Sequence, residues 1–528
     1  MVSTLNGQNV ADILQSDSFK KSLRDSNSEI VLQYINKRYI SLNDSDYAIY
    51  AEHLKTVLTK LVQLMKKSDA LFNSLYLKEH FAGSYPDGLK IGKPEEYDMN
   101  MIIRLPVDHS KLEFETVTPS FIMIKGQKAF NEGSSLSTDL LRWVDDEGYL
   151  LQTKFRDWME SVLTKAFDGL PFHESSGGNT RCLKVGKQDG EEQEYKIGYK
   201  KSGPAMTVKV VTPDNLSIDV DLVPAFQFGP PIWPDSVLPL PKNCNKKSWM
   251  VVPKPKKLKE FEAPGPNDAR EWRMSFLDQE REILNGTGTV KPTIKLLKKL
   301  RDSTKFKLSS YAIKSVVLME MQTQNSEFWK QRGTYIFLFM LHRLTEHIRT
   351  GHIPFYWDGK DDLLKMKEVE CQNVSNRFGK ILKDIIKGVG ENNPYIIAEK
   401  LLTKEELAEV KENCQVPSGV AAAAKNSGDP KATSSNSMKT KPDSDNTVLA
   451  HILETLTKIQ EGQEALPHRL LQLLPSVPRN IVHDHTITTS LNSNHGECQK
   501  KQAELEERIA NLEDIVKLLK QKLDSCAI

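Results

Sequence analysis

The sequence is poor in the features that mark secreted and membrane proteins. It has only six cysteines among 528 residues, and no two of them form a C-x-x-C pair, which excludes a disulfide-stapled scaffold. Sparse, scattered cysteines are typical of a reduced cytosolic protein. The longest strongly apolar run, 335–341, has seven residues, whereas a membrane span needs about 20. The first residues lack a charged region and an apolar core, so we expect no signal peptide, no membrane partner and a cytoplasmic location.

The chain also lacks an overall excess of charge. Its 72 Lys and Arg residues nearly balance 70 Asp and Glu residues, leaving a formal net charge of +2, whereas nucleic-acid-binding proteins usually carry a basic surplus. Two segments nevertheless carry a net charge of +6 each, 241–260 and 289–307. Such clusters favour a polyphosphate partner over a merely solvated surface.

The hydrophobic pattern predicts an α/β part followed by an all-helical part. Residues 1–45 are polar and predict a weakly structured leader with at most one short helix. Apolar residues recur at helical spacing over 46–78, which predicts one long amphipathic helix. This helix opens a core that we expect to span 46–270, with short strands and glycine-rich turns. The pattern over 271–412 predicts a helical lobe.

The composition changes again near residue 413. Residues 413–446 lack aromatic side chains and are rich in Ser, Ala, Lys and Pro, which predicts a disordered linker. A helical tail is expected at 447–528, with a short coiled coil at 503–525. Its apolar seam alternates spacings of four and three and consists of Leu505, Ile509, Leu512, Val516, Leu519 and Leu523. The tail would form a homo-oligomer, recruit an adaptor, or fold back on the body as a single helix.

Two short segments of the α/β part are candidates for chemistry. Gly83 followed by Ser84 predicts a tight turn whose N–H groups and hydroxyl suit a phosphate. Glu96 and Asp98 are one residue apart on a predicted strand, and a strand places such residues on one face. Paired carboxylates offer the oxygen ligands that Mg²⁺ prefers. Each feature alone is also common on ordinary surfaces.

Further carboxylates are predicted on the strand LSIDVDLVPAF, residues 216–226. Its aliphatic residues alternate with Asp219 and Asp221, so both aspartates share one face. Carboxylates in a core strand cost stability unless a cation pairs with them. Together with Glu96 and Asp98 they predict a two-metal site that activates a hydroxyl and stabilises a leaving pyrophosphate.

The order of these motifs resembles the nucleotidyltransferase site of the polymerase-β type. The E-x-D motif begins twelve residues after Ser84, and a distant strand ends in D-x-x-P-A-F. That strand is similar to the third-aspartate strand of the oligoadenylate synthetases. The resemblance makes Asp221 the third ligand and Asp219 a secondary candidate.

Later segments resemble cyclic GMP-AMP synthase and so narrow the resemblance to the cGAS-like receptors of animals. EWRMSFLDQEREIL, 271–284, is similar to the segment with which that synthase grips its nucleotides, and 249–254 resembles the strand before it. The segments 293–300 and 308–314 look like its later lysine and Ser-Tyr contacts. The match covers 46–412. It implies an α/β (α+β) fold: a bilobal polymerase-β-type core with a mixed sheet, plus a C-terminal all-helical lobe.

The resemblance implies a role for each matched residue. Glu96, Asp98 and Asp221 would be the catalytic ligands of Mg²⁺ or Mn²⁺. The residues that would contact ATP and GTP are Gly83, Ser84, Arg273, Ser275, Glu280, Lys295, Ser310, Tyr311 and Lys314. From the residues alone, Lys295 and Lys314 fit a solvated helix face equally well.

Departures from the synthase pattern limit what is implied. Ala82 and Leu277 stand where the synthase has threonine and serine, so the choice of base is not implied. The synthase inserts a His/Cys zinc module where this chain has only LNGTGTVKPTI, 284–294, so we expect no zinc. That absence resembles the insect receptors, whose activating ligand is double-stranded RNA.

We therefore expect a sensor enzyme of innate antiviral immunity. Double-stranded RNA would dock on the long helix and the lysine-rich segments, and the enzyme would join ATP and GTP into a cyclic dinucleotide messenger. A catalytically silent scaffold and a linear oligonucleotide synthetase are the alternatives. The intact carboxylates argue against the first, and W-R-M-S-F argues against the second.

Overall fold

The computed structural model describes most of the chain up to residue 416. The described residues are 4–5, 8–41, 44–131, 139–173, 180–186, 192–202, 205–242, 244–255 and 265–416, and they belong to one compact unit. The expected tail, 447–528, and nearly all of the expected linker lie outside the described residues. The coiled coil therefore stays a prediction.

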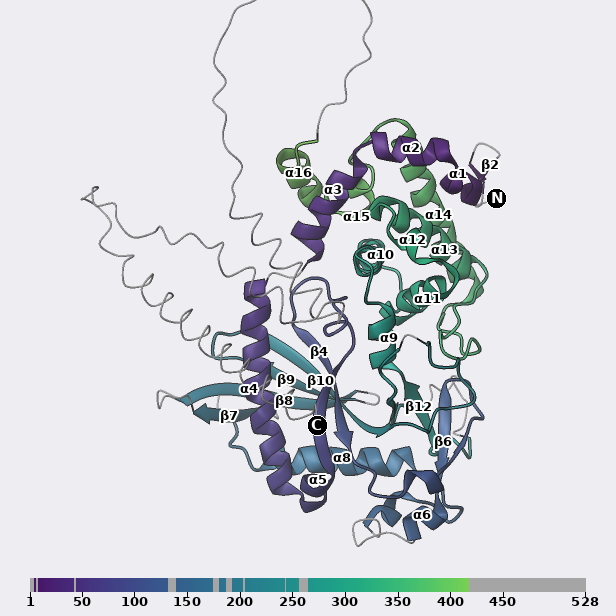
Figure 1. The fold of residues 1–528 in the computed structure, drawn as a ribbon. Coiled ribbons are helices and arrows are strands. Elements are labelled where there is room, and N and C mark those ends of the chain that lie inside the picture. The colour runs from purple at the N-terminus through teal and green to yellow at the C-terminus, as the bar shows by residue number, and fades with distance from the viewer. Residues whose placement is uncertain are drawn as a thin grey trace, which may run out of the picture. The chain divides into compact units, whose positions relative to one another are not determined.

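A mixed sheet of ten strands forms the centre of the α/β part (Figure 1). The strands are β3 (Tyr76–Ala82), β4 (Glu96–Ile103), β5 (Glu113–Glu115), β6 (Phe121–Lys125), β7 (Arg181–Gly186), β8 (Glu192–Ser202), β9 (Ala205–Val211), β10 (Ser217–Phe228), β11 (Trp249–Val252) and β12 (Glu271–Ser275). The main order is β5-β6-β12-β11-β10-β9-β8-β7, and β4 pairs with both β10 and β3. The β4–β10 pair is parallel, whereas the other pairs in this sheet are antiparallel. The short strands β1 (Thr4–Leu5) and β2 (Gln8–Asn9) pair separately.

Helices cover the sheet. The elements in this part are α4 (Asp44–Ser68), α5 (Ala70–Leu75), η2 (His109–Lys111), α6 (Gln127–Asn131), η3 (Leu141–Trp143) and α8 (Gln152–Asp168). The apolar face of α4 is buried through Leu54, Val57, Leu58, Leu61 and Met65, and α4 contacts α8 and β7.

The expectation of a single helix over 46–78 is wrong beyond Ser68. Helix α4 ends at Ser68, and Asp69 adopts an extended conformation. The Asp69 carboxylate accepts a hydrogen bond from the N–H of Phe72 at 2.9 Å and caps the short helix α5. The chain then enters β3, so the last residues of the expected helix belong to the sheet.

The helical lobe follows β12. Its helices are α9 (Leu277–Ile283), α10 (Val290–Thr304), α11 (Ser310–Thr323), α12 (Ser326–Trp329), α13 (Gly333–Arg349), α14 (Glu368–Gly390), α15 (Ala398–Leu401) and α16 (Lys404–Asn413). Strand β12 belongs to the sheet, so the helices begin a few residues after the expected start at 271.

The expectation of a weakly structured leader is wrong. The N-terminal residues form α1 (Val10–Gln15), α2 (Asp17–Asp25), α3 (Ser28–Ile35) and a π-helical turn, η1 (Asn36–Ile40). These elements contact α10, α13, α14 and α16. The carboxylate of Glu29 on α3 accepts hydrogen bonds from the N–H groups of Gly333 and Thr334 at 3.2 and 2.9 Å. The two N–H groups belong to the first turn of α13, where they have no partner within the helix, so the leader completes the helical lobe.

The expected fold class, a mixed sheet followed by a helical lobe, is confirmed. The described cysteines, Cys182, Cys244, Cys371 and Cys414, are buried and form no disulfide with one another. Within the described part of the chain, no helix combines the length and apolarity needed to cross a membrane.

Candidate active site

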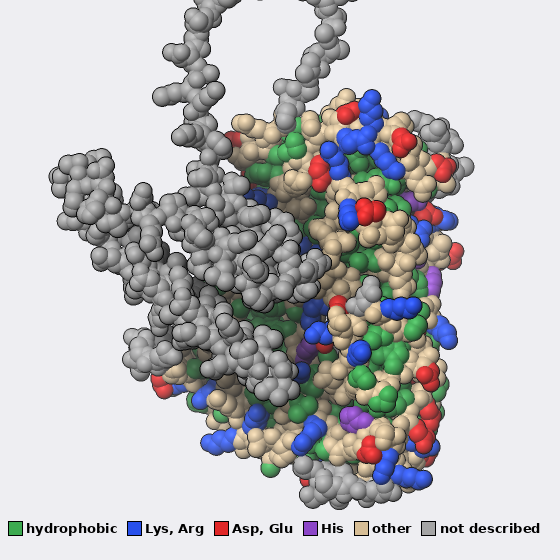
Figure 2. Space-filling model, in the orientation of Figure 1, with side chains coloured by type: hydrophobic (Ala, Val, Ile, Leu, Met, Phe, Trp, Pro, Cys, Tyr) green, Lys and Arg blue, Asp and Glu red, His purple; other side chains and the backbone are tan. Residues whose placement is uncertain are grey.

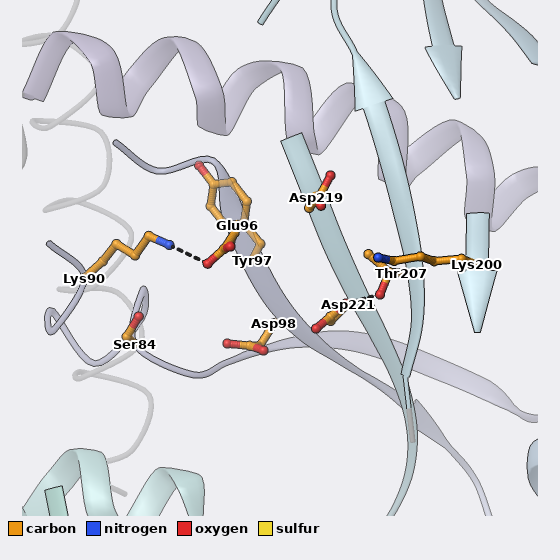
Figure 3. Close-up of a pocket in the computed structure, with 9 residues that line it drawn as sticks. All are labelled: Ser84, Lys90, Glu96, Tyr97, Asp98, Lys200, Thr207, Asp219 and Asp221. Atoms are coloured by element: carbon orange, nitrogen blue, oxygen red, sulfur yellow. Dashed lines mark hydrogen bonds and ion pairs between the residues drawn. The ribbon is translucent and has the colours of Figure 1, made fainter. Parts of the chain in front are cut away.

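Two neighbouring parallel strands bring the expected carboxylates together. The register pairs Glu96 of β4 with Asp219 of β10, and Asp98 with Asp221. Buried residues alternate with accessible ones at the start of β4 and over the first half of β10, so the carboxylates share the accessible face. In Figure 3, Asp98 and Asp221 lie side by side on the two strands, and Ser84 lies across from Asp98.

The carboxylates line a pocket of about 290 Å³, close to the lower end of the range for small-molecule sites. Its lining residues are Ser84, Lys90, Glu96, Tyr97, Asp98, Lys200, Thr207, Asp219 and Asp221. The pocket thus contains Ser84 and all three expected metal ligands.

The surroundings of Asp98 disfavour its ionisation. Asp98 is accessible from the pocket, but desolvation by the surrounding protein and the charges of Asp221 and Glu96 raise its pKa. The Thr207 hydroxyl donates to Oδ1 of Asp221 at 2.5 Å, and Lys90 lies 3.3 Å from Glu96. A divalent cation would relieve the repulsion, and carboxylate oxygens are the ligands that Mg²⁺ and Mn²⁺ prefer. The residues therefore fit a metal site.

Glycine is required at position 83. Its φ is +70°, and a Cβ built there would lie 1.8 Å from Oδ2 of Asp98. Any side chain would collide with the carboxylate, so only glycine lets the loop between β3 and β4 approach so closely. This contact sets the position of Ser84 relative to Asp98.

Helix α10 presents lysines beside this loop. Burial is the main cause that lowers the pKa of Lys291, Lys295 and Lys298, the last to about 8. Lys298 donates a hydrogen bond to the Leu89 carbonyl at 2.6 Å. Among the described residues, no carboxylate lies within ion-pair distance of Lys295. A partly buried cation without a counter-charge, as Lys295 is among the described residues, suits an anion such as a triphosphate.

Glu280, Tyr311 and Lys314 lie together, but outside the pocket lining. The Tyr311 hydroxyl donates to Oε1 of Glu280 at 2.5 Å, and Nε1 of Trp357 donates to the same oxygen at 3.0 Å. Lys314 is 6% exposed and lies 2.8 Å from Oε2 of Glu280. Its Nζ also lies 2.6 Å from Oδ2 of Asp87. The expected nucleotide contacts of these residues stay predictions.

The remaining expected contacts occupy two further places. Arg273 forms an ion pair with Asp361 at 2.6 Å, and its guanidinium lies over the ring of Phe355. Ser275 ends β12, opposite Met250 of β11. Ser310, at the start of α11, accepts a hydrogen bond from Arg301 at 2.8 Å. None of the three lines the 290 Å³ pocket.

Several lining residues were not expected from the sequence. Thr207 faces Asp221 because β9 and β10 are an antiparallel hairpin, and the short turn at 212–215 was a signal for that register. Lys200 lies on β8 and Tyr97 between the two expected ligands, and no sequence signal marked either as a lining residue. The expected absence of zinc stays a prediction: ligand atoms of His173, Cys182 and Glu194, outside the pocket, lie within 4.8 Å of one another.

The fold and the site define a nucleotidyltransferase. Residues 85–286 match the family model described as the Mab-21 protein nucleotidyltransferase domain. Residues 289–381 match the Mab-21 protein HhH/H2TH-like domain, which covers much of the helical lobe.

Curated relatives narrow this class. The cyclic GMP-AMP synthase-like receptor of Ctenocephalides felis is 34% identical over 399 residues, which cover 72% of this chain and 88% of that protein. The receptor of the same name from Tribolium castaneum is 34% identical over 386 residues, 72% of this chain and 92% of that protein. Cyclic GMP-AMP synthase-like receptor 1 of Drosophila simulans is 27% identical over 379 residues, 68% of this chain and 88% of that protein. The chain belongs to the family of cyclic GMP-AMP synthase-like receptors, which confirms the resemblance found in the sequence.

Proposed function

We propose that the chain is a cytoplasmic sensor of innate antiviral immunity that makes a cyclic GMP-AMP-type messenger from ATP and GTP when double-stranded RNA is bound. The observation that carries the proposal is the register pairing of Asp98 with Asp221 in a pocket that Ser84 also lines. The names of the insect relatives support the cyclic product.

The carboxylates would hold the metal and move a proton. Glu96, Asp98 and Asp221 would bind Mg²⁺ or Mn²⁺, which would neutralise triphosphate charge and lower the pKa of the attacking hydroxyl. Asp221 is the candidate to accept that proton. The Thr207 hydroxyl occupies its Oδ1, which leaves Oδ2 for this role.

The nucleotide phosphates would lie between the loop and α10. The N–H groups of the turn and the hydroxyl of Ser84 would bind phosphate oxygens. Lys295 would supply a positive charge that is not paired with any carboxylate of the described residues. Arg273, Ser275, Ser310 and their neighbours remain proposed contacts of the bases and the second nucleotide. Positioning and charge stabilisation would provide most of the rate enhancement.

The activator would bind to exposed lysines outside the pocket. On α4, Lys55 and Lys67 are exposed, and so are Lys246 and Lys247 in the first basic segment. Figure 2 shows Lys and Arg side chains spread over one face, interspersed with Asp and Glu. A-form RNA is bound through its shape, phosphates and 2′-hydroxyls, which does not require a continuous basic field.

A ligand panel tests the proposal. The full chain is incubated with NTPs and Mg²⁺ or Mn²⁺, with duplex RNA, duplex DNA or no nucleic acid, and the product is analysed by mass and linkage. A cyclic dinucleotide formed only with duplex RNA supports the proposal. Stronger activation by DNA would overturn the RNA assignment. No product under any condition would favour the scaffold, and a product that single-strand nucleases digest would favour the linear synthetase.

Charge reversal separates activation from chemistry. Replacing Lys55 and Lys67 by glutamate should weaken RNA activation and reduce its salt dependence, because phosphate contacts are lost. The matched control is Lys387→Glu, an exposed lysine of α14. Equal RNA activation in the two variants would exclude α4 from the RNA surface.

A further inference from the structure

One carboxylate ties the loop between β3 and β4 to the helical lobe. Asp87 is 2% exposed. Its Oδ2 accepts a hydrogen bond from Nζ of Lys314 on α11 at 2.6 Å, and its Oδ1 accepts one from Nε of Arg281 on α9 at 3.1 Å. Arg281 also donates to the Phe81 carbonyl at 3.1 Å. The segment that carries Ser84 is therefore held at both ends, at Phe81 by α9 and at Asp87 by α9 and α11.

The cations of this cluster are already neutralised. Lys314 lies between Asp87 and Glu280, and Arg281 between Asp87 and Asp278, which is 3.3 Å away. Burial alone would lower the pKa of Lys314, but Glu280 and Asp87 outweigh it and raise the pKa, so Lys314 keeps its charge. A triphosphate would have to compete with two carboxylates for this one buried ammonium group.

Lys295 provides the contrast. It is partly buried, and among the described residues the neighbouring charge that shifts its pKa is that of Lys291, which lowers it further. An anion that approaches α10 therefore gains attraction at Lys295 without breaking an ion pair, whereas at Lys314 it gains little. The unpaired charge of Lys295 therefore suits phosphate binding on α10, whereas the paired charge of Lys314 suits a contact that holds the loop.

We call the contacts of Asp87 with Lys314 and Arg281 the loop anchor. A hydrogen-bonded turn connects it to the catalytic carboxylates. The N–H of Leu89 donates to the Ser84 carbonyl at 2.8 Å, and the N–H of Gly88 donates to the Tyr85 carbonyl at 3.1 Å. Asp87 lies within this turn, so the hydrogen bonds of the turn connect it to Ser84. Gly83, next to Ser84, touches Asp98 closely enough to exclude any side chain.

We propose that Asp87 is a positioning residue of the transferase reaction, and that Lys314 and Arg281 serve it by fixing Ser84 against Asp98 rather than by touching the nucleotide. The catalytic part of this inference rests on the proposed function, whereas the anchoring itself does not. It replaces the nucleotide contact expected for Lys314 with a contact to the loop.

Kinetics of four variants test the assignment. Asp87→Asn and Lys314→Met should each lower kcat about 10- to 100-fold, because small displacements of positioning groups have effects of this size. The KM values for ATP and GTP should change much less than kcat and by a similar factor in the two single variants, because both displace the same loop. The kcat of the double variant should be little lower than that of the worse single variant, because both substitutions remove the same contact between Asp87 and Lys314. Asp87→Glu, which keeps the charge, should recover part of kcat.

A contact between Lys314 and the nucleotide predicts a different pattern. Lys314→Met would then raise KM, Asp87→Asn would leave KM unchanged, and the two effects would add in the double variant. That pattern would overturn the proposal.

Hydrogen exchange tests the anchor without turnover. In the full chain, the N–H groups of Gly88 and Leu89 should exchange faster in Asp87→Asn than in wild type. The control is Asp384→Asn, which removes an ion pair to Lys400 on the lobe and should leave these N–H groups unchanged. Unchanged exchange in Asp87→Asn would overturn the proposal. An absence of product from wild type would instead refute the proposed function, while the exchange result would still decide the anchor.

Discussion

Asp98 and Asp221 are register partners on adjacent parallel strands that are far apart in the sequence. Neighbouring strands lie about 4.8 Å apart, so the two carboxylates share one small volume. The charge of Asp221 disfavours the ionisation of Asp98. The arrangement therefore costs folding free energy until a cation binds, which is typical of a site built to hold a metal.

Asp98→Asn should lower turnover of NTPs by about 100- to 1,000-fold, the range seen when one charge-stabilising group is removed. The amide keeps the shape of the side chain but loses the charge that would hold the metal. Product formation at saturating NTPs and Mg²⁺ measures this, with Asp384→Asn as the control for the same chemical change elsewhere. Turnover equal to wild type would show that the metal-site assignment is wrong.

The same substitution should stabilise the metal-free protein. Desolvation and the neighbouring carboxylates raise the folded-state pKa of Asp98 above its ordinary value, so its ionised form destabilises the fold at neutral pH. As the pH falls toward the raised pKa, the folded state takes up the proton first, and wild-type stability rises toward that of Asp98→Asn. Urea unfolding in the presence of a chelator, at neutral and at lower pH, should show this convergence. A less stable Asp98→Asn at neutral pH would contradict the electrostatic explanation.

Lys295→Met should raise the KM for the triphosphates roughly 10- to 100-fold, the value of a hydrogen bond to a charged group. Burial and then Lys291 lower the pKa of Lys295, so nucleotide affinity should begin to fall at a lower pH than for an ordinary lysine. Lys299→Met is the matched control on the same helix, because Lys299 forms an ion pair with Glu406 of α16. Equal KM values for the two variants would exclude Lys295 from phosphate binding.

Ile35→Ala should lower the free energy of unfolding by about 2–4 kcal/mol, because Ile35 is fully buried and leaves a cavity. Ile30 lies on the same helix but is 39% exposed, so Ile30→Ala should change stability by less than about 1 kcal/mol. Chemical unfolding of the two variants compares them directly. Equal, small effects would mean that α3 contributes little to the lobe.

The strands that carry the carboxylates could be predicted because the pattern that indicates them lies within each strand. Asp219 and Asp221 alternate with aliphatic residues, and that alternation alone decides which face is buried. The break of the long helix was also marked locally, since Asp69 is a favoured capping residue, but the continuing apolar spacing hid it.

The leader and the loop anchor could not be predicted in this way. Helix α3 has eight residues, too few to be stable alone, so its helicity depends on packing against distant helices. Asp87 and Lys314 are 227 residues apart, and neither has a sequence context that indicates the other. Contacts of this kind arise only when the fold brings the segments together.

The hydrogen bonds between Glu29 and the start of α13 also affect when the helical lobe can form during synthesis. The two ends of that contact are 304 residues apart, and ribosomes add roughly 5–20 residues per second, so α3 waits roughly 15–60 s for its partner. During that interval its apolar side chains have no lobe to pack against and are available to chaperones. Closure of the helical lobe is therefore a late event in the synthesis of this protein.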